Sequence, residues 1–324
     1  METVRTHERS AMIHENMDLS NLTTERENPA SFDIDSKSTH EILVIINSED
    51  KKVPFAVEKA LDCISALVDD VVESFKKGGK LVYIGAGTSG RLGVLDASEC
   101  PPTYGTPPAQ VQGLIAGGRE ALVRSIESAE DKEDQGIKDI EAIGFSSIDV
   151  LVGITASGQA PYVLGAMRRA RELGAVVGAI SCNANSGTFE LAQHRIFVDV
   201  GPEVVTGSTR MKSGTAQKLV LNMITTAAMI RIGKVYRNLM IDLKPVNKKL
   251  VERSKNLIMR ATECDRATAE KAFAASGKKP KIAILMVLLG IDALAAEELV
   301  AANDGHLSKA VEAFRGKGGG KPTI

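Results

Sequence analysis

The chain has few of the residues on which several common functions depend. Its 324 residues include no Trp, four Tyr and eight Phe, so aromatic platforms for stacking nucleic-acid bases are not expected. The formal net charge is only −1, which gives no electrostatic reason to bind nucleic acid or an anionic membrane. We therefore expect neither nucleic acid nor a membrane as a partner.

Cysteine and histidine are scarce and scattered. The cysteines are at positions 63, 100, 182 and 264, and the histidines are at positions 7, 14, 40, 194 and 306. The absence of a Cys-x-x-Cys pair favours reduced thiols in a cytoplasmic protein over a disulfide framework. Because the histidines lack ligand spacing, we expect no catalytic metal ion.

Long apolar segments are also missing. The longest apolar run, Ile282–Leu289, is too short to span a bilayer, and the N-terminus lacks the apolar core of a signal peptide. The contents of 44% hydrophobic and 25% charged residues are ordinary for a soluble globular protein. At this length the chain can form a large core and a smaller second module.

Composition and periodicity divide the chain into four regions. Residues 1–37 are polar, and we expect a disordered first fifteen residues followed by an extended arm. Residues 38–245 begin with helical spacing and continue as alternating strands and helices. Residues 246–314 show only helical spacing, and residues 315–324 form a glycine-rich tail that we expect to be flexible.

The second region predicts a doubly wound α/β domain. Two helices are expected between Ser38 and Lys77, with a break near Asn47–Pro54. The expected strands are Leu81–Ile84, Val111–Ala116, Asp149–Ile154, Val176–Ser181 and His194–Val198. The expected helices between and after them are Arg119–Glu130, Pro161–Leu173 and Gly214–Gly233. Short apolar strands between helices predict a five-stranded parallel sheet, in which ligands lie beyond the carboxyl ends of the strands.

The third region predicts three or four short helices. The candidate helices are Asn256–Thr262, Arg266–Ala275, Pro280–Leu289 and Leu294–Asn303. Gly277, Gly290 and Gly305 lie between or after them and mark turns. We therefore expect a small all-α subdomain after the sheet.

A glycine-rich loop follows the first expected strand. Leu81–Ile84 leads into the small residues Gly85–Gly90, and such a loop at a helix N-terminus is suited to a phosphate. The next helical stretch ends at the carboxylate Glu99, so we expect sugar-phosphate chemistry. The same glycines match a dinucleotide-binding pattern, but that pattern needs an acidic residue further on. Cys100–Gly118 contains no Asp or Glu, which disfavours a nicotinamide or flavin cofactor.

Two further loops repeat this chemistry. The loop Thr155–Pro161 follows an expected strand and carries hydroxyl side chains, and its Pro161 suits the first turn of the next helix. Gly201–Lys218 places hydroxyls and three cations before an apolar helix, where an Arg can grip a phosphate with two N–H groups. Ordinary turn chemistry and a solvated basic loop are the alternative interpretations.

The motifs together resemble the N-acetylmuramic acid 6-phosphate etherases, a family of the sugar isomerase (SIS) domain superfamily. The resemblance runs from about residue 20 to about residue 312, and Gly201–Lys218 is shared with the glucokinase regulatory proteins. The segments that carry it are Leu22–Arg26, Asn28-Pro29, Gly85–Gly90, Ala97–Pro102, Gly113–Gly118, Thr206–Lys218 and Asn247. It implies a flavodoxin-like SIS domain, a C-terminal UBA-like bundle and a homodimer whose site is near the interface. The helices of residues 40–77 are candidates for that interface.

The resemblance also implies a reaction and its catalytic residues. The D-lactyl ether of N-acetylmuramic acid 6-phosphate is cut by elimination and then hydration, which gives N-acetylglucosamine 6-phosphate and D-lactate in cell-wall sugar catabolism and recycling. No cofactor is needed, because the aldehyde of the open sugar acidifies the C2 proton. Glu99 would be the proton donor and Glu130 the base. Burial beside Cys100–Pro102 would raise the pKa of Glu99, whereas the acidic run around Glu130 by itself predicts a solvated helix end.

The resemblance further implies a set of phosphosugar-binding residues. They are Thr88, Ser89, Thr155, Ser157, Gln159, Ser208, Arg210 and Lys218, of which Lys218 has a structural role as its alternative. Two other functions remain open: a non-catalytic phosphosugar-binding regulator and a phosphosugar isomerase. Retention of both Glu99 and Glu130 disfavours the regulator, and the lack of a suitable His for ring opening disfavours the isomerase.

Overall fold

The computed structural model describes residues 22–243, 245 and 247–316. The first fifteen residues and positions 317–324, for which the sequence predicts disorder and flexibility, lie outside this part of the chain. Within it, no helix is long and apolar enough to cross a membrane.

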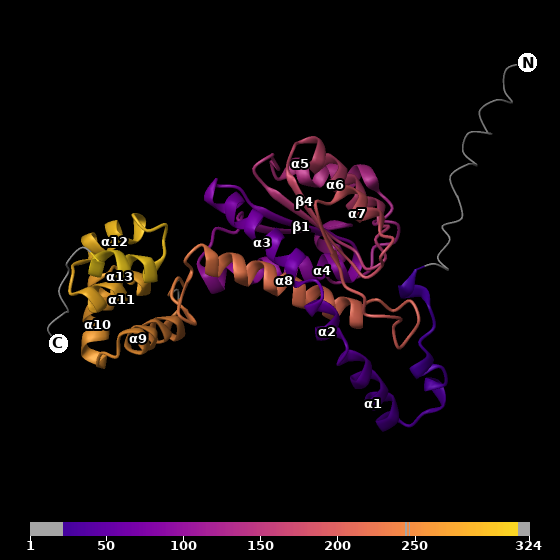
Figure 1. The fold of residues 1–324 in the computed structure, drawn as a ribbon, viewed down its shortest axis with the longest axis horizontal. Coiled ribbons are helices and arrows are strands. Elements are labelled where there is room, and N and C mark those ends of the chain that lie inside the picture. The colour runs from indigo at the N-terminus through magenta and orange to yellow at the C-terminus, as the bar shows by residue number, and fades with distance from the viewer. Residues whose placement is uncertain (1–21, 244, 246, 317–324) are drawn as a thin grey trace, which may run out of the picture.

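The centre of the molecule is a five-stranded parallel sheet, as predicted (Figure 1). Its strands are β1 (Leu81–Gly85), β2 (Val111–Ile115), β3 (Val150–Ile154), β4 (Val176–Ser181) and β5 (His194–Phe197). The strand order is β2-β1-β3-β4-β5. The chain therefore reverses its winding direction between β1 and β3, where open α/β sheets bind their ligands.

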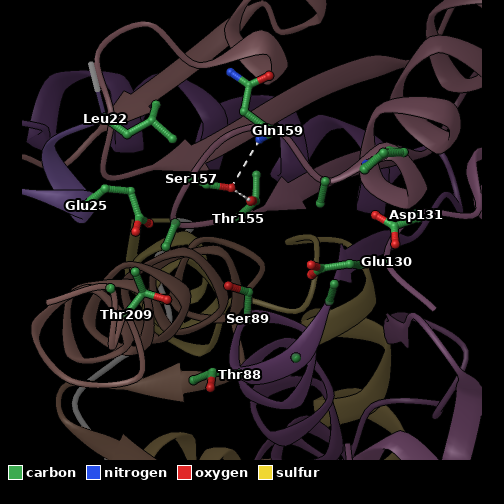
Figure 2. Close-up of a pocket in the computed structure, with 16 residues that line it drawn as sticks. Leu22, Glu25, Thr88, Ser89, Glu130, Asp131, Thr155, Ser157, Gln159 and Thr209 are labelled. Atoms are coloured by element: carbon green, nitrogen blue, oxygen red, sulfur yellow. Dashed lines mark hydrogen bonds between the residues drawn. The ribbon is translucent and has the colours of Figure 1, made fainter. Parts of the chain in front are cut away.

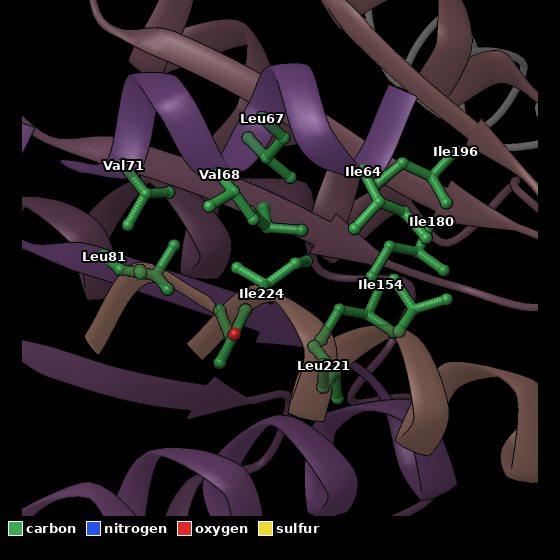
Figure 3. Close-up of a cluster of buried hydrophobic side chains, with 14 of the residues drawn as sticks. Ile64, Leu67, Val68, Val71, Leu81, Ile154, Ile180, Ile196, Leu221 and Ile224 are labelled. Atoms are coloured by element: carbon green, nitrogen blue, oxygen red, sulfur yellow. The ribbon is translucent and has the colours of Figure 1, made fainter. Parts of the chain in front are cut away.

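Helices cover both faces of this sheet (Figure 1). One face carries α3 (Leu61–Lys76), α4 (Gly87–Tyr104) and α8 (Lys212–Arg231), and the other carries α5 (Glu133–Ala142), α6 (Pro161–Glu172) and α7 (Gly187–Leu191). On the first face, Leu67 and Val71 of α3 and Ile224 of α8 pack against the strands (Figure 3). All three side chains are buried, so apolar burial holds α3 and α8 to the sheet that carries the loops.

Residues 38–77 form three helices where the sequence predicted two. After short 3-10 turns at Thr23–Glu25, Pro29–Ser31 and Ile34–Ser36 come α1 (Thr39–Asp50), α2 (Val53–Glu58) and α3. Apolar residues keep helical spacing across the second break, at Lys59–Ala60, which is why periodicity showed only the first. α1 extends away from the sheet (Figure 1), and its Leu43 and Val44 are exposed.

The prediction of a helix over Arg119–Glu130 is wrong. This stretch forms a 3-10 turn, Gly118–Leu122, followed by a loop, and α5 begins only at Glu133. Ser128, within the stretch, has a positive φ of 56°, and this left-handed conformation interrupts a right-handed helix. Gly117 and Gly118, immediately before it, have φ values of 85° and 66°.

The helix that contains Glu99 does not end there. α4 continues through Pro101 and Pro102 to Tyr104, and Gly105 ends it with a φ of +66°. The two prolines lie in its last turns, where their fixed φ is helical and only the last hydrogen bonds are lost. Glu99 therefore lies on the body of a helix.

The C-terminal helices pack around an apolar cluster of their own. They are α9 (Lys248–Thr262), α10 (Arg266–Ala275), α11 (Pro280–Leu289), α12 (Ala293–Ala301) and α13 (Leu307–Gly316). The hairpin of β6 (Val235–Tyr236) and β7 (Leu239–Met240) joins this cluster through Tyr236 and Leu239. The boundary at 245/246 and the UBA-like character of the bundle remain predictions.

A buried ion pair connects α1 to the start of α8. Lys212 Nζ lies 2.7 Å from Glu49 Oε2, and the two side chains are only 1% and 4% exposed. Asn28 Nδ2 donates to the same oxygen at 3.0 Å, and Lys52 pairs with the other oxygen. Burial alone would raise the pKa of Glu49, but the hydrogen bonds from Lys212, Lys52 and Asn28 lower it to about 2.

Replacing Glu49 should therefore destabilise the protein in a pH-dependent way. The pKa is about 2 when folded against 4.5 for a free Glu, so the stabilisation is complete above pH 4.5 and is lost as the pH falls toward 2. We expect Glu49→Gln to lower the free energy of unfolding by about 3 kcal/mol at pH 7, measured by urea denaturation. The difference from wild type should shrink between pH 4.5 and 2. Glu73→Gln, which removes an exposed pair with Lys76, is the control and should change little; equal stability of Glu49→Gln and wild type would contradict the assignment.

Candidate active site

A pocket of about 400 Å³ lies at the carboxyl ends of β1 and β3, where the winding of the sheet reverses (Figure 2). Its described lining residues are Leu22, Glu25, Ala86, Gly87, Thr88, Ser89, Glu130, Asp131, Thr155, Ala156, Ser157, Gln159, Ala160, Pro161, Gly207 and Thr209. Six of the ten residues predicted for the site are among them: Thr88, Ser89, Glu130, Thr155, Ser157 and Gln159. The sequence thus identified the loops that meet at this point.

The loop after β1 brings the N-terminus of α4 to the pocket. A Cβ atom on Gly90 would lie 2.6 Å from the carbonyl oxygen of Gly85, so only glycine allows the helix to start this close to the strand. Ser89 is buried and its hydroxyl donates to Gln217 Oε1 on α8 at 2.9 Å. The free N–H groups of the first helical turn therefore face the pocket in a fixed position.

The loop after β3 supplies hydroxyls to the same space. Thr155 Oγ1 accepts a hydrogen bond from the N–H of Gly158 at 3.2 Å, and Ser157 Oγ accepts one from the N–H of Gln159 at 3.3 Å. Gly158 has a φ of +82°, and a Cβ there would lie 2.1 Å from Ser186 Oγ. The turn is thus held in one shape, with Thr155 and Ser157 between Glu25 and Glu130 (Figure 2).

Glu130 comes from the loop that precedes α5 and not from a helix end. Its backbone carbonyl accepts the N–H of Tyr162 at 2.9 Å, which ties the loop to the start of α6. The positive φ of Ser128 lets the chain turn back toward the sheet two residues earlier. The exposed Glu130 side chain lines the pocket with its neighbour Asp131, so the acidic run is divided between the site and the solvated start of α5.

Three lining residues were not themselves assigned a binding role by the sequence analysis. Leu22 and Glu25 belong to the N-terminal arm, and Thr209 belongs to the loop before α8. Asn183 holds the arm, because its Oδ1 accepts the N–H of Thr23 at 2.7 Å. The motif Leu22–Arg26 was the available signal, but nothing in its spacing indicated contact with a pocket.

Four predicted residues are not among the described lining residues of this pocket: Glu99, Ser208, Arg210 and Lys218. Glu99 is twelve residues beyond Gly87 on α4, about 18 Å along the helix at 1.5 Å per residue, and it is exposed. The prediction of a desolvated Glu99 is therefore wrong for a single chain, because Cys100 faces the core while Glu99 faces outward. Glu99 and Glu130 of one chain do not meet.

The basic loop before α8 places none of its three cations among the described lining residues of this pocket. Arg210 and Lys218 are exposed, and Lys212 is buried with Glu49. The Glu203 carboxylate accepts the N–H groups of Lys212 and Ser213, each at 2.9 Å. This carboxylate offsets the helix dipole and explains why cations are tolerated at the start of α8.

The described lining residues of the pocket therefore combine hydroxyls, one amide and three carboxylates, with no Lys, Arg or His. In the part of the chain that the structure describes, no three His, Cys, Asp or Glu side chains come together as a metal site. Hydroxyls and helix N–H groups can hold a phosphate, and Glu130 can take or give a proton nearby.

The winding of the sheet and the two hydroxyl loops at its reversal point define a SIS-type domain. Residues 63–171 match the family model of the glucokinase regulatory protein N-terminal SIS domain. The N-acetylmuramic acid 6-phosphate etherase of Photorhabdus laumondii is 55% identical over 92% of this chain and 99% of its own length. Those of Photobacterium profundum and Klebsiella aerogenes are 56% and 54% identical, over 99% and 98% of their lengths. The chain belongs to the N-acetylmuramic acid 6-phosphate etherase family, and it is an enzyme, a carbon–oxygen lyase.

Proposed function

We propose that the protein cleaves the D-lactyl ether of N-acetylmuramic acid 6-phosphate, giving N-acetylglucosamine 6-phosphate and D-lactate. We place this reaction in the cytoplasmic recycling of cell-wall sugars. The observation that carries the proposal is the meeting of Glu130 with two hydroxyl loops in one pocket, in a chain that is 55% identical to an etherase over 99% of that relative's length.

The chemistry needs one base and one acid. Glu130 takes the proton from C2 of the open-chain sugar, the C2–C3 double bond forms, and the C3–O bond breaks. A second group protonates the departing oxygen, so that D-lactate leaves. Water then adds its hydroxyl to C3 and a proton to C2. The C1 aldehyde of the sugar stabilises the negative charge that develops at C2, so the scheme uses no cofactor.

The hydroxyl loops hold the phosphosugar. We propose that Thr88 and Ser89, at the N-terminus of α4, and Thr155, Ser157 and Gln159, after β3, bind its phosphate and sugar oxygens. Ser208 and Arg210 flank the lining residue Thr209, and we assign them contacts from the same side. Hydroxyl and N–H donors suit a phosphate here because they hydrogen-bond its oxygens and, being uncharged, form no ion pairs with the nearby carboxylates.

We further propose that the enzyme is a homodimer in which Glu99 serves the pocket of the partner subunit. Glu99 is exposed and lies about 15 Å along α4 beyond Ser89, the last residue of α4 among the described lining residues of its own pocket. It shares a helix face with Leu95 at i−4, which is 53% exposed. Phe55 of α2 and Leu43 of α1 add exposed apolar surface that a second copy would bury. Lys218, exposed on α8, would approach the partner's substrate from the same direction.

D-Lactate release from N-acetylmuramic acid 6-phosphate in water enriched in ¹⁸O tests the function directly. We expect one D-lactate per sugar and one heavy oxygen at C3 of the product. Heavy oxygen in lactate instead would contradict cleavage of the C3–O bond. Binding of the phosphosugar without lactate release would favour a regulator, and conversion of an aldose to a ketose phosphate would favour an isomerase.

A further inference from the structure

A second cavity adjoins the active-site pocket. It has a volume of about 210 Å³, and we call it the side chamber. Ala86, Gly87, Glu130 and Asp131 line both cavities. Glu130 therefore borders the two spaces, and a ligand in the pocket can extend a branch past it into the side chamber.

The side chamber contains a cation that the main pocket lacks. Arg91 of α4 is half-buried in its wall. Its Nε donates to the carbonyl of Leu122 and its Nη2 to the carbonyl of Arg124, both at 3.2 Å. Among the described residues that line either cavity, Arg91 is the only Lys, Arg or His.

The Arg91 guanidinium still has donors to offer. It carries five N–H groups, and the two carbonyls account for only part of them. No carboxylate of residues 22–243, 245 or 247–316 lies within ion-pair distance of it. A half-buried guanidinium that meets only backbone carbonyls is suited to receive a carboxylate through two parallel hydrogen bonds.

The surroundings would otherwise repel an anion. Glu127, Glu130 and Asp131 all border the side chamber, so a carboxylate that entered it would meet like charges. Arg91 offsets this repulsion at one point on the wall. The side chains of Ala121 and Ile126 provide an apolar surface nearby, so the side chamber can hold a small group with one carboxylate and one methyl.

We propose that the side chamber binds the lactyl group of the substrate, with its carboxylate on Arg91 and its methyl against Ala121 and Ile126. The inference rests on the proposed function. If Glu130 takes the proton from C2, the neighbouring carbon C3 lies beside Glu130, and the branch on C3 enters the adjoining space. The carboxylate keeps its charge throughout the reaction, so Arg91 binds and orients the lactyl group and transfers no proton. This contact selects sugars that carry the ether.

The test compares Arg91→Gln with wild type on three reactions. The first is lactate release from N-acetylmuramic acid 6-phosphate. The second is cleavage of the 3-O-ethyl ether of N-acetylglucosamine 6-phosphate, which lacks the carboxylate. The third is exchange of the C2 proton of N-acetylglucosamine 6-phosphate in D₂O, which needs the base and the phosphate site but no lactyl group.

We expect Arg91→Gln to lower kcat/KM for the lactyl substrate by about 10- to 100-fold, mainly through KM. The rates of ethyl-ether cleavage and of C2-proton exchange should stay within about twofold of wild type. For the lactyl substrate, the kcat/KM of Arg91→Lys should lie between those of Arg91→Gln and wild type. Arg124→Gln is the matched control, because Arg124 is exposed and pairs with Glu120; it should behave as wild type.

Equal losses of Arg91→Gln in all three reactions would overturn the side-chamber assignment and leave Arg91 as a support for residues 122–124. Unchanged activity on the lactyl substrate would overturn it as well. Failure of the proposed function has a different signature, because wild type itself would then release no lactate.

Discussion

Glu130→Gln is expected to lose at least about 10³-fold in lactate release, because the amide cannot accept the C2 proton. The same variant should also fail to exchange the C2 proton of N-acetylglucosamine 6-phosphate in D₂O, which NMR follows directly. The substitution preserves the size of the side chain and the backbone carbonyl that accepts the Tyr162 N–H, so the fold should be retained.

Asp134→Asn is the control for this loss. It removes a charge from the same acidic run, but Asp134 is exposed in the first turn of α5 and lies outside the lining of the active-site pocket. Near-normal activity of Asp134→Asn would separate the role of Glu130 from a general effect of the negative charges. Retained C2 exchange in Glu130→Gln would assign the base to another group, and Asp131 and Glu25 are the other carboxylates of the pocket.

Glu99→Gln is expected to lose about 10²- to 10⁴-fold in lactate release, while C2 exchange of N-acetylglucosamine 6-phosphate continues because that exchange has no leaving group to protonate. Mixed dimers of two inactive variants give a sharper test of the partner role. If Glu99 serves the partner's pocket, a dimer of one Glu99→Gln and one Glu130→Gln subunit contains one intact site. Random exchange of subunits between these two inactive variants should then restore about a quarter of wild-type activity.

The measurement uses the two variants with different affinity tags, unfolded and refolded together, against each variant refolded alone. Purification through both tags isolates the mixed dimer, which should have half the wild-type activity per dimer. A mixed dimer as inactive as its parents would place Glu99 and Glu130 in the same subunit's site and would require α4 to move. A monomer in solution with full activity would contradict the partner role outright.

The elements of the sheet domain followed closely from local patterns. Continuous apolar runs at Val150–Ile154 and Val176–Ser181 indicated strands buried on both faces, and the glycines and hydroxyls after β1 and β3 indicated where a ligand binds. These signals are local, because burial and turn chemistry depend on residues a few positions apart. Helices were misplaced where single residues decided the backbone, as with the positive φ of Ser128.

The site was only partly predictable, because some of its residues depend on contacts between segments far apart in the sequence. The loops that carry Thr88 and Ser157 were predicted because a helix N-terminus and a strand end each leave a local signature, and the resemblance named the residues within them. Glu25 reaches the pocket through Asn183, which is 160 residues from Thr23, and no local pattern records such a contact. Lys212 belongs to the loop that the sequence predicted to bind an anion, yet its ammonium group pairs with the carboxylate of Glu49, 163 residues away.

The sequence by itself determined the parallel sheet, the two hydroxyl loops and the family resemblance, and that resemblance is what singled out Glu130 from a run of acids. Only the tertiary structure decided that Glu130 borders two cavities, that Arg91 faces the smaller one and that Glu99 points away from its own pocket. The physical reason is that side-chain identity and short-range periodicity specify secondary structure and turns. The position of a charge relative to a cavity depends instead on how helices such as α4 and α8 pack on the sheet, and that packing is set by the whole buried core.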